Sequence, residues 1–241
     1  MVAKSELKFI RSLHQKKYRL RHGLFVAEGV KLVGELLASP LRVHSVYATE
    51  PELFQDATPL TERELKQASS LVHPNKVLAV FHIPQPAPLQ FSDWVLALDG
   101  VRDPGNLGTL IRLCDWFGIG RLLCSPDTVD AYNPKVLQAT MGSIGRVQLH
   151  YLPLEEALRG CGVPVYGASM EGQAVAAQPL QGPGVLVMGS ESHGLGDGIR
   201  KLLTATLSVP AFGQAESLNV ATAAAILLYE IRRQGAGAIQ K

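Results

Sequence analysis

The segment that decides the fold is Val209-Pro-Ala-Phe-Gly-Gln-Ala-Glu-Ser-Leu-Asn-Val-Ala-Thr-Ala-Ala-Ala-Ile-Leu-Leu-Tyr-Glu230. An apolar run ending at Pro210 predicts a strand, Gly213 lies in a loop, and the Ala-rich stretch predicts a long helix. Ser217 and Asn219 lie where the loop enters the helix, where short polar side chains usually cap free backbone N–H groups. Two glycine-rich segments upstream also join a strand to polar residues, so the three are interpreted together.

From residue 93 onward, short apolar runs alternate with helical patterns. Strands are predicted at Trp94–Leu98, Arg121–Cys124, Val163–Ala168, Val185–Met188 and Leu207–Val209. Helices are predicted at Leu107–Phe117, Leu154–Leu158 and Leu218–Arg232. Strands that are apolar on both faces and separated by helices indicate an α/β fold with a parallel sheet between helix layers. In such sheets ligands bind beyond the C-terminal ends of the strands.

The N-terminal part predicts a smaller α/β module. Helices are expected at residues 4–20, 30–37 and 61–67, and strands at residues 25–29, 43–48 and 77–83. The stretch Pro84-Gln-Pro-Ala-Pro-Leu-Gln90 cannot continue a helix or a central strand, so it predicts a linker. The expected division is therefore residues 1–84, a linker at 85–92, and a C-terminal domain at 93–241.

Composition and charge fit a globular protein. Of the 241 residues, 46% are hydrophobic and 18% are charged, which is enough to bury a sizeable core. The net charge of +2 does not by itself indicate a nucleic-acid binder. Basic side chains do gather near the N-terminus, at Lys4, Lys8, Arg11, Lys16, Lys17, Arg19, Arg21 and Lys31. Such a run is typical of a solvated helix face and equally of a phosphate-binding surface.

The cysteines and the start of the chain bear on its environment. Cys114, Cys124 and Cys161 show no zinc-ligand spacing, and they are expected to be reduced thiols. The N-terminal residues lack a signal-peptide core, and no apolar run is long enough for a membrane span. We expect a cytoplasmic protein that binds no metal ion and does not associate with a membrane.

Two upstream segments carry candidate functional residues. In Leu98–Arg112 a strand runs into a Gly/Pro loop, and Asn106 is placed to cap the helix that follows; Arg112 lies six residues further on. In Val185–Leu195 a buried strand runs into a glycine loop with Glu191, whose expected partner is an arginine of the first segment. Neither segment has the Gly-x-Ser-x-Gly of a nucleophile elbow or the Gly-x-Gly-x-x-Gly of a dinucleotide site.

Together the three segments resemble the SpoU (TrmH) family of RNA ribose 2′-O-methyltransferases, within the trefoil-knotted SPOUT class. The family's first motif is matched by Asn106 and Arg112, its second by Gly189, Glu191 and Gly194, and its third by Pro210, Ser217, Leu218, Asn219 and Val220. The connecting segment Asn133–Ser143 is similar as well. The N-terminal module, with Phe25-Val-Ala-Glu-Gly29, resembles the L30e-like substrate-binding extension of rRNA-directed members.

The resemblance implies a cofactor and a set of roles. S-adenosylmethionine is the implied methyl donor, held mainly by backbone groups at Gly189, Val209 and Leu218, with Met188 and Ser190 as neighbours. Arg112 is the implied central catalytic residue. Because arginine stays protonated in proteins, we expect it to bind the phosphate and orient the ribose hydroxyl rather than to act as base. Hydrogen bonds from the remaining motif side chains would hold the site, namely Asn106, Glu191, Ser217 and Asn219.

Partners follow from the same resemblance. The family's dimers predict a homodimer through the C-terminal domain, although core packing also accounts for the apolar final helix. The substrate is expected to be RNA, most simply ribosomal RNA, contacted through Lys16, Lys17, Arg19 and Arg21. A tRNA-directed enzyme and a non-catalytic RNA-binding or ribosome-assembly protein remain the alternatives.

Overall fold

The computed structural model describes residues 2–180 and 182–235, and the chain divides into two compact units. The first unit contains Met1–Gln85 together with Asp130–Arg146. The second contains Pro86–Val129 together with Val147–Lys241. The boundary at residues 85 and 86 falls in the Pro-rich stretch, whereas the membership of residues 130–146 differs from the division expected from sequence. The chain thus leaves the second unit once and returns to it.

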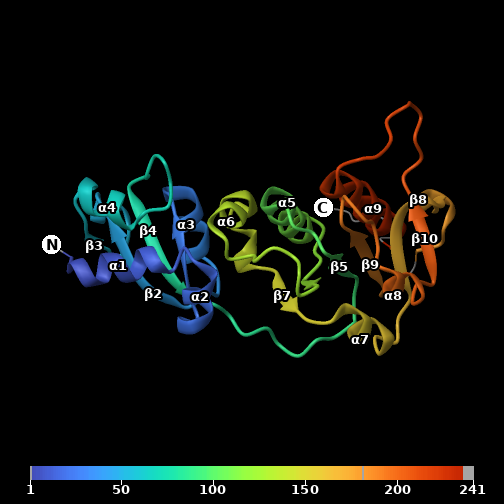
Figure 1. The fold of residues 1–241 in the computed structure, drawn as a ribbon, viewed down its shortest axis with the longest axis horizontal. Helices are drawn as coiled ribbons and strands as arrows, with labels where there is room; N and C mark the ends of the chain where they lie inside the picture. The colour runs from blue at the N-terminus through green and yellow to red at the C-terminus, as the bar shows by residue number, and fades with distance from the viewer. Residues whose placement is uncertain (1, 181, 236–241) are drawn as a thin grey trace. The chain divides into compact units, whose positions relative to one another are not determined.

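The first unit is built on a four-stranded sheet (Figure 1). The strand order is β1 (Leu24–Glu28), β4 (Val77–His82), β2 (Val43–Ala48) and β3 (Thr58–Pro59). The central strand β4 runs antiparallel to both β1 and β2, and β3 runs parallel to β2. The helices are α1 (Lys4–Ser12), α2 (Lys16–His22), α3 (Val30–Leu37), α4 (Glu62–Ala68) and α6 (Pro134–Thr140), with a 3-10 turn at Pro51–Leu53.

The predicted basic helix over residues 4–20 is in fact two helices. Leu7 and Ile10 of α1 and the following Leu13 are buried in the core of the unit, and the chain turns after them. This turn leaves the carbonyl groups of Leu13 and His14 outside any helix, and both accept hydrogen bonds from Nη1 of Arg19, at 3.0 and 2.6 Å. Gly23 ends α2 in the left-handed region at φ 63°, a conformation that glycine adopts readily at the end of a helix.

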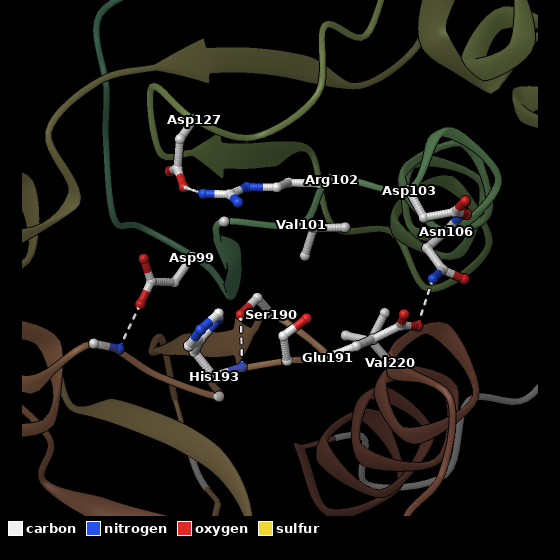
Figure 2. A pocket seen from close by; sticks show the side chains of 14 residues that line it. Asp99, Val101, Arg102, Asp103, Asn106, Asp127, Ser190, Glu191, His193 and Val220 are labelled. Carbon is white, nitrogen blue, oxygen red and sulfur yellow. Dashed lines mark hydrogen bonds and ion pairs between the residues drawn. The ribbon is translucent and has the colours of Figure 1, made fainter.

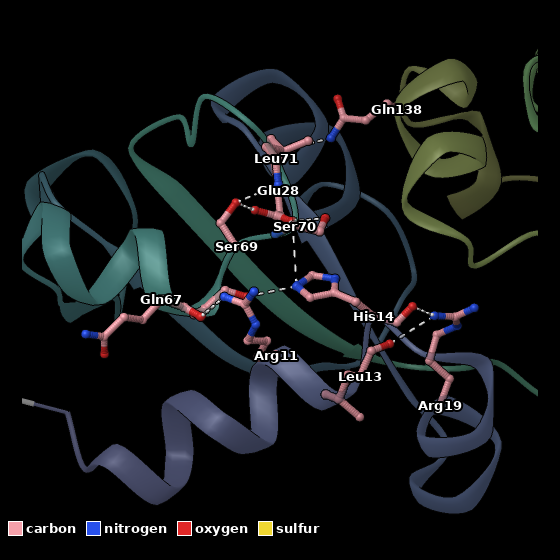
Figure 3. Close-up of polar contacts among 11 residues, drawn as sticks. Arg11, Leu13, His14, Arg19, Glu28, Gln67, Ser69, Ser70, Leu71 and Gln138 are labelled. Atoms are coloured by element: carbon pink, nitrogen blue, oxygen red, sulfur yellow. Dashed lines mark hydrogen bonds and ion pairs between the residues drawn. The ribbon is translucent and has the colours of Figure 1, made fainter.

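Residues 130–146 are fixed to the first unit by polar contacts. Arg19 is only 2% exposed, and its Nε and Nη2 donate to Oδ2 of Asp130 at 3.2 and 2.5 Å. The Gln138 amide donates to the carbonyl oxygen of Glu28 at 2.8 Å (Figure 3). The Glu28 carboxylate is itself buried and accepts hydrogen bonds from the hydroxyl groups of Ser69 and Ser70. Sequence patterns did not predict α6, which starts after the capping side chain of Asn133.

The second unit contains a six-stranded, wholly parallel sheet. Its order is β10 (Ala205–Ser208), β8 (Val165–Ala174), β9 (Val185–Gly189), β5 (Val95–Asp99), β6 (Arg121–Cys124) and β7 (Gln148–Tyr151). This confirms the predicted parallel α/β fold, although β7 was not predicted. The helices are α5 (Pro104–Trp116), α7 (Leu154–Arg159), α8 (Asp197–Arg200) and α9 (Val220–Gly235), with a 3-10 turn at Val175–Ala177. A further 3-10 turn, at Ser143–Gly145, belongs to the first unit.

Helices cover both faces of this sheet, which explains why its strands lack polar alternation. Helices α5 and α9 pack together on one face, and α7 and α8 lie on the other (Figure 1). Val95, Ala97 and Val187 point into a cluster with Leu154 and Leu158 of α7. The intervening strand residues, such as Leu96 and Leu98, are fully buried too. Among the described helices, none has both the length and the apolar character needed to cross a bilayer.

Candidate active site

A pocket of about 260 Å³ lies at the C-terminal ends of two adjacent strands of the second unit (Figure 2). Strands β5 and β9 are paired throughout their length, and connections from them lead to opposite sides of the sheet. Ligands of open α/β sheets bind at this kind of switch point. The lining comes from four segments of the sequence: Asp99–Asp103 with Asn106, Asp127, Ser190–Gly194 with Gly196, and Val220.

Asn106 has a different role from the predicted helix cap. Helix α5 begins earlier, with Pro104 in its first turn, and Asp103 is the capping residue. The Asp103 carboxylate accepts a hydrogen bond from the backbone N–H of Asn106 at 2.8 Å. Because the cap is supplied by Asp103, the amide side chain of Asn106 is available to the pocket.

The three predicted motif segments meet in one triangle of hydrogen bonds. Nδ2 of Asn106 donates to Oε1 of Glu191 at 2.6 Å. Nδ2 of Asn219 donates to Oδ1 of Asn106 at 2.9 Å and to the same Glu191 oxygen at 3.2 Å. Oδ1 of Asn219 accepts from the N–H groups of Ala221 and Thr222, so Asn219 also caps α9, as predicted. The partners of Glu191 are therefore two amides, and the expected arginine is not among them in the described part of the chain.

The loop after β9 is a short, tightly closed hairpin. The backbone groups of Ser190 and Gly194 exchange hydrogen bonds of 3.1 and 2.9 Å, and the Ser190 hydroxyl accepts from the His193 N–H at 3.2 Å. A side chain at Gly189 would overlap the backbone of Gly194, and Gly194 itself has φ +64°. Both motif glycines are thus required by geometry. Figure 2 shows Glu191 directed toward Asn106 and His193 on the pocket wall. Sequence reasoning did not single out His193.

The opposite wall is held by a second polar network. The Ser125 hydroxyl donates to Asp127 at 2.7 Å and accepts from the backbone N–H of Gly100 at 2.8 Å. Arg102 pairs with Asp127 at 3.0 Å. These two partners, Ser125 first, lower the pKa of the Asp127 carboxyl, which is therefore ionised at neutral pH. Asp99 accepts from the N–H of Gly196 at 2.8 Å and so links the two loops. Sequence patterns gave no signal for Asp127, because it follows β6 at a distance from every motif.

Two predicted catalytic residues lie outside both the pocket and the triangle of hydrogen bonds. Arg112 is exposed on α5, and its guanidinium makes no hydrogen bond or ion pair within residues 2–180 and 182–235. Six residues at 3.6 residues per turn place it about 120° from Asn106 around the helix, so the two side chains do not share one side of α5. Ser217 lies in the exposed loop between β10 and α9.

The residues predicted to hold the cofactor are dispersed. Ser190 lines the pocket, Gly189 ends β9 directly beneath it, and the side chain of Met188 is buried in the sheet. Val209 and Leu218 belong to the loop from β10 to α9, which stands out from the elements that it joins (Figure 1). Every residue of this loop from Pro210 to Asn219 is exposed.

The predicted RNA-binding residues separate into two kinds. Lys16, Lys17 and Arg21 are exposed on α2. Arg19 is buried by its contacts with Asp130 and the helix-break carbonyls, so its prediction as an RNA contact is wrong. The cysteines are free thiols, and burial raises the pKa of Cys124 to about 12. Within the described residues, no cluster of three or more His, Cys, Asp or Glu is arranged to hold a metal ion.

The fold and the pocket define a class of protein: a parallel α/β domain whose polar site is closed by loops from three separate sequence motifs. Residues 93–229 match the SpoU rRNA Methylase family, and residues 4–79 match the MRM3-like substrate binding domain. The chain belongs to the SpoU rRNA Methylase family.

Individual relatives extend this similarity over both units. The 23S rRNA (guanosine(2553)-2′-O)-methyltransferase RlmP of Bacillus subtilis (strain 168) is 34% identical over 233 residues, which cover 92% of this chain and 94% of the relative. A TrmH-family structure from Porphyromonas gingivalis matches with a TM-score of 0.88 and 39% identity, over 98% of this chain and 100% of that one. The AdoMet-bound rRNA methyltransferase from Sinorhizobium meliloti matches with a TM-score of 0.85 and 29% identity, over 97% and 96% of the two chains.

Proposed function

We propose that this protein transfers a methyl group from S-adenosylmethionine to a ribose 2′-hydroxyl of ribosomal RNA. The observation that carries the proposal is the triangle of Asn106, Glu191 and Asn219, which joins one side chain from each motif at the mouth of the pocket. The full-length similarity to RlmP, named as a 23S rRNA 2′-O-methyltransferase, supports the substrate class.

The residues of the pocket fit a methyl donor that carries a sulfonium and an ammonium group. Four carboxylates line or rim it, those of Asp99, Asp103, Asp127 and Glu191, against the single guanidinium of Arg102. Backbone at Gly100, Gly194 and Gly196 allows close approach of a ligand. When bound, the donor supplies the electrophilic methyl group. Ser190, Gly189 and Met188 would hold it from β9, and Val209 and Leu218 from the exposed loop.

The pocket is small for a complete cofactor site. A pocket of about 260 Å³ is below the range of about 300–1,000 Å³ typical of small-molecule sites. None of residues 210–219 lines the pocket, and the first residue after them, Val220, does. We infer that the loop closes on the donor and completes the enclosure that the pocket lacks.

The chain's own side chains then position the RNA. Glu191 fixes both amides of the triangle, so that Asn106 and Asn219 present a defined pattern to the ribose. Arg112 binds the phosphate next to the target nucleotide and orients its hydroxyl, and Ser217 adds a hydrogen bond. The hydroxyl proton passes to the phosphate or to solvent, because arginine remains protonated.

The place of Arg112 connects catalysis to the proposed homodimer. Thr109, Arg112 and Trp116 form an exposed row on α5, and Thr222, Ile226 and Tyr229 form another on α9. Trp116 is 81% exposed and Tyr229 58%. Because α5 and α9 pack side by side, we expect the rows to form one exposed face, in which Trp116, Ile226 and Tyr229 offer apolar surface to a second copy of the chain. Arg112 lies within this face, so we propose that it serves the pocket of the partner copy.

Further features of the proposal follow from similarity to the family. They are a trefoil knot in the C-terminal domain, an L30e-like RNA-binding fold for residues 1–84, a linker at 85–92, a catalytic domain at 93–241 and a cytoplasmic location. No metal ion takes part in the proposed reaction.

Methyl transfer tests the proposal directly. Tritiated S-adenosylmethionine is incubated with unmodified bulk rRNA and, separately, with bulk tRNA, and the nucleosides are analysed. Label in a 2′-O-methylnucleoside of rRNA is expected. Label confined to tRNA would favour the tRNA-directed alternative. Absence of label together with absence of donor binding by calorimetry would favour a non-catalytic RNA-binding or assembly protein.

A further inference from the structure

One end of the sheet in the first unit carries a group of cationic and aromatic side chains that the proposed site does not use. Arg42 directly precedes β2, His44 lies within it, and His82 ends β4. The two strands are antiparallel, so the start of β2 meets the end of β4. The backbone N–H of His82 donates to the carbonyl oxygen of Arg42 at 2.9 Å. The three side chains are therefore anchored on adjacent rigid strands.

A β-bulge turns His44 toward His82. Val43 pairs with Phe81 and Ser45 pairs with Val80, which leaves His44 as the extra residue. Bulges characteristically redirect a side chain. The rings of His44 and His82 have centroids 5.7 Å apart and are tilted by 54°. His44 is exposed and His82 is half-buried, so the ring pair faces solvent.

The end of α2 joins the same edge of the sheet. The N–H of Ile83 donates to the carbonyl oxygen of Gly23 at 2.7 Å, and the exposed Arg21 lies two residues before that glycine in the last turn of α2. At the far end of β2 the charge is balanced, because Glu50 pairs with Lys76 at 2.8 Å. Burial first, then the charges of Arg42 and His44, lower the pKa of His82, as expected where cations are crowded.

We propose that Arg42, His44 and His82, continued by Arg21, form a contact surface for an unpaired stretch of RNA. The inference rests on the proposed function and specifies how the first unit recognises the substrate. Unpaired bases stack on imidazole faces, and guanidinium groups bind phosphates. An acidic protein would use the charges but not the pair of rings, which is why RNA is the favoured partner.

Binding of short RNA tests this surface with matched controls. The variants are His44→Ala and Arg42→Gln, and the controls are His73→Ala and Arg63→Gln, all at exposed positions of the same unit. Fluorescence anisotropy follows a labelled single-stranded RNA of mixed sequence and its perfect duplex. His44→Ala should raise the Kd for the single strand roughly tenfold and for the duplex much less. Arg42→Gln should flatten the plot of log K against log salt by about 0.7.

Three outcomes would overturn the proposal. They are equal effects of His44→Ala and His73→Ala, no effect of either test variant, and equal loss of single-strand and duplex binding. Circular dichroism of each variant establishes that the unit is folded. A wild-type protein that binds the single strand through His44 but transfers no methyl group would refute the proposed function and leave this inference intact. Methyl transfer with an unchanged KM for RNA in both test variants would support the proposed function and refute this inference.

Discussion

The side chains of Asn106 and Glu191 are joined by a 2.6 Å hydrogen bond across 85 residues of sequence. Each follows one of two paired strands, β5 and β9, and each belongs to a different motif. The bond therefore fixes the spacing of the two loops between which the pocket lies. It also leaves the Glu191 carboxylate with amide partners only, among the residues described.

Exchange of the two functional groups tests this relationship. Asn106→Asp places a second carboxylate against Glu191 and removes the donor, so kcat should fall by about 10- to 100-fold. The double variant with Glu191→Gln restores a donor, an acceptor and the net charge, and should recover part of the loss. Steady-state methyl transfer measures both, with Glu156→Gln, at an exposed position of α7, as control. Wild-type kcat in the single variant would exclude a role for the bond.

Arg112→Ala should abolish turnover and leave the affinity for S-adenosylmethionine nearly unchanged, because Arg112 lies outside the pocket. Arg112→Lys should be little better, since a point charge does not reproduce the guanidinium fork. Mixing Arg112→Ala protein with Glu191→Gln protein should restore activity if Arg112 serves the partner copy, since one of the two sites of a mixed dimer then has both residues intact. Calorimetry and methyl transfer provide the readouts. A mixture as inactive as its components, with subunit exchange verified, would restrict Arg112 to its own chain.

The exposed loop after β10 should be cleaved readily after Glu216 by a glutamate-specific protease, because every residue from Pro210 to Asn219 is exposed. S-adenosylmethionine should slow this cleavage if the loop closes on the donor. Mass spectrometry follows release of the fragment that starts at Ser217. Cleavage after Glu62, an exposed residue of the first unit, should be unaffected and serves as the internal control. Equal protection at both positions would indicate a global effect rather than loop closure.

Arg19→Ala should destabilise the protein by about 3 kcal/mol, because it leaves Asp130 without its buried partner and two carbonyl groups without a donor. Lys17→Ala, on the exposed side of the same helix, should change the stability by about 0.5 kcal/mol or less. Urea denaturation followed by circular dichroism compares the two. Equal stabilities would contradict the structural role assigned to Arg19.

Stability should also decrease in mild acid through His150. Burial first, then the charge of Arg121, lower the pKa of His150, and its Nε2 is buried without a hydrogen-bond partner among the described residues. The unfolded chain therefore binds a proton first, at about pH 6.5. The free energy of unfolding is full above that pH and falls as the pH drops toward the lower pKa of the folded state. His82 contributes with the same sign. His150→Gln should reduce the slope measured by urea denaturation between neutral and mildly acidic pH, whereas His73→Gln should not.

Sequence patterns predicted most elements because the packing of both units agrees with local periodicity. The strands at residues 43–48 and 121–124 and the helix at 30–37 have the predicted bounds. Strand β7 was missed because the prediction relied on apolar runs. In this edge strand the polar Gln148 and His150 alternate with Leu149 and Tyr151. The single N-terminal helix was wrong because tertiary contacts of Arg19 stabilise a break that local propensity does not show.

The site was predictable only as a set of residues. The resemblance to the family's three motifs identified Asn106, Glu191 and Asn219, and parallel pairing of β5 and β9 explains why two of them meet. The partners within the set were not predictable, since an arginine is the commoner partner of a carboxylate. Asp127 and His193 were missed because their positions depend on the loops after β6 and β9 and not on a pattern of residue types.

The excursion of residues 130–146 into the first unit bears on the order in which the protein forms during synthesis. The sheet of that unit is complete when His82 has left the ribosome, but Asp130 follows only after β5 and β6 have been made. Until Asp130 has been made, either Arg19 lies in the first unit without its carboxylate partner or α2 does not pack against the sheet. The contacts of the first unit are therefore complete only after residues 130–146 have been made, and a chimera that exchanges the N-terminal part between relatives should carry residues 130–146 with it.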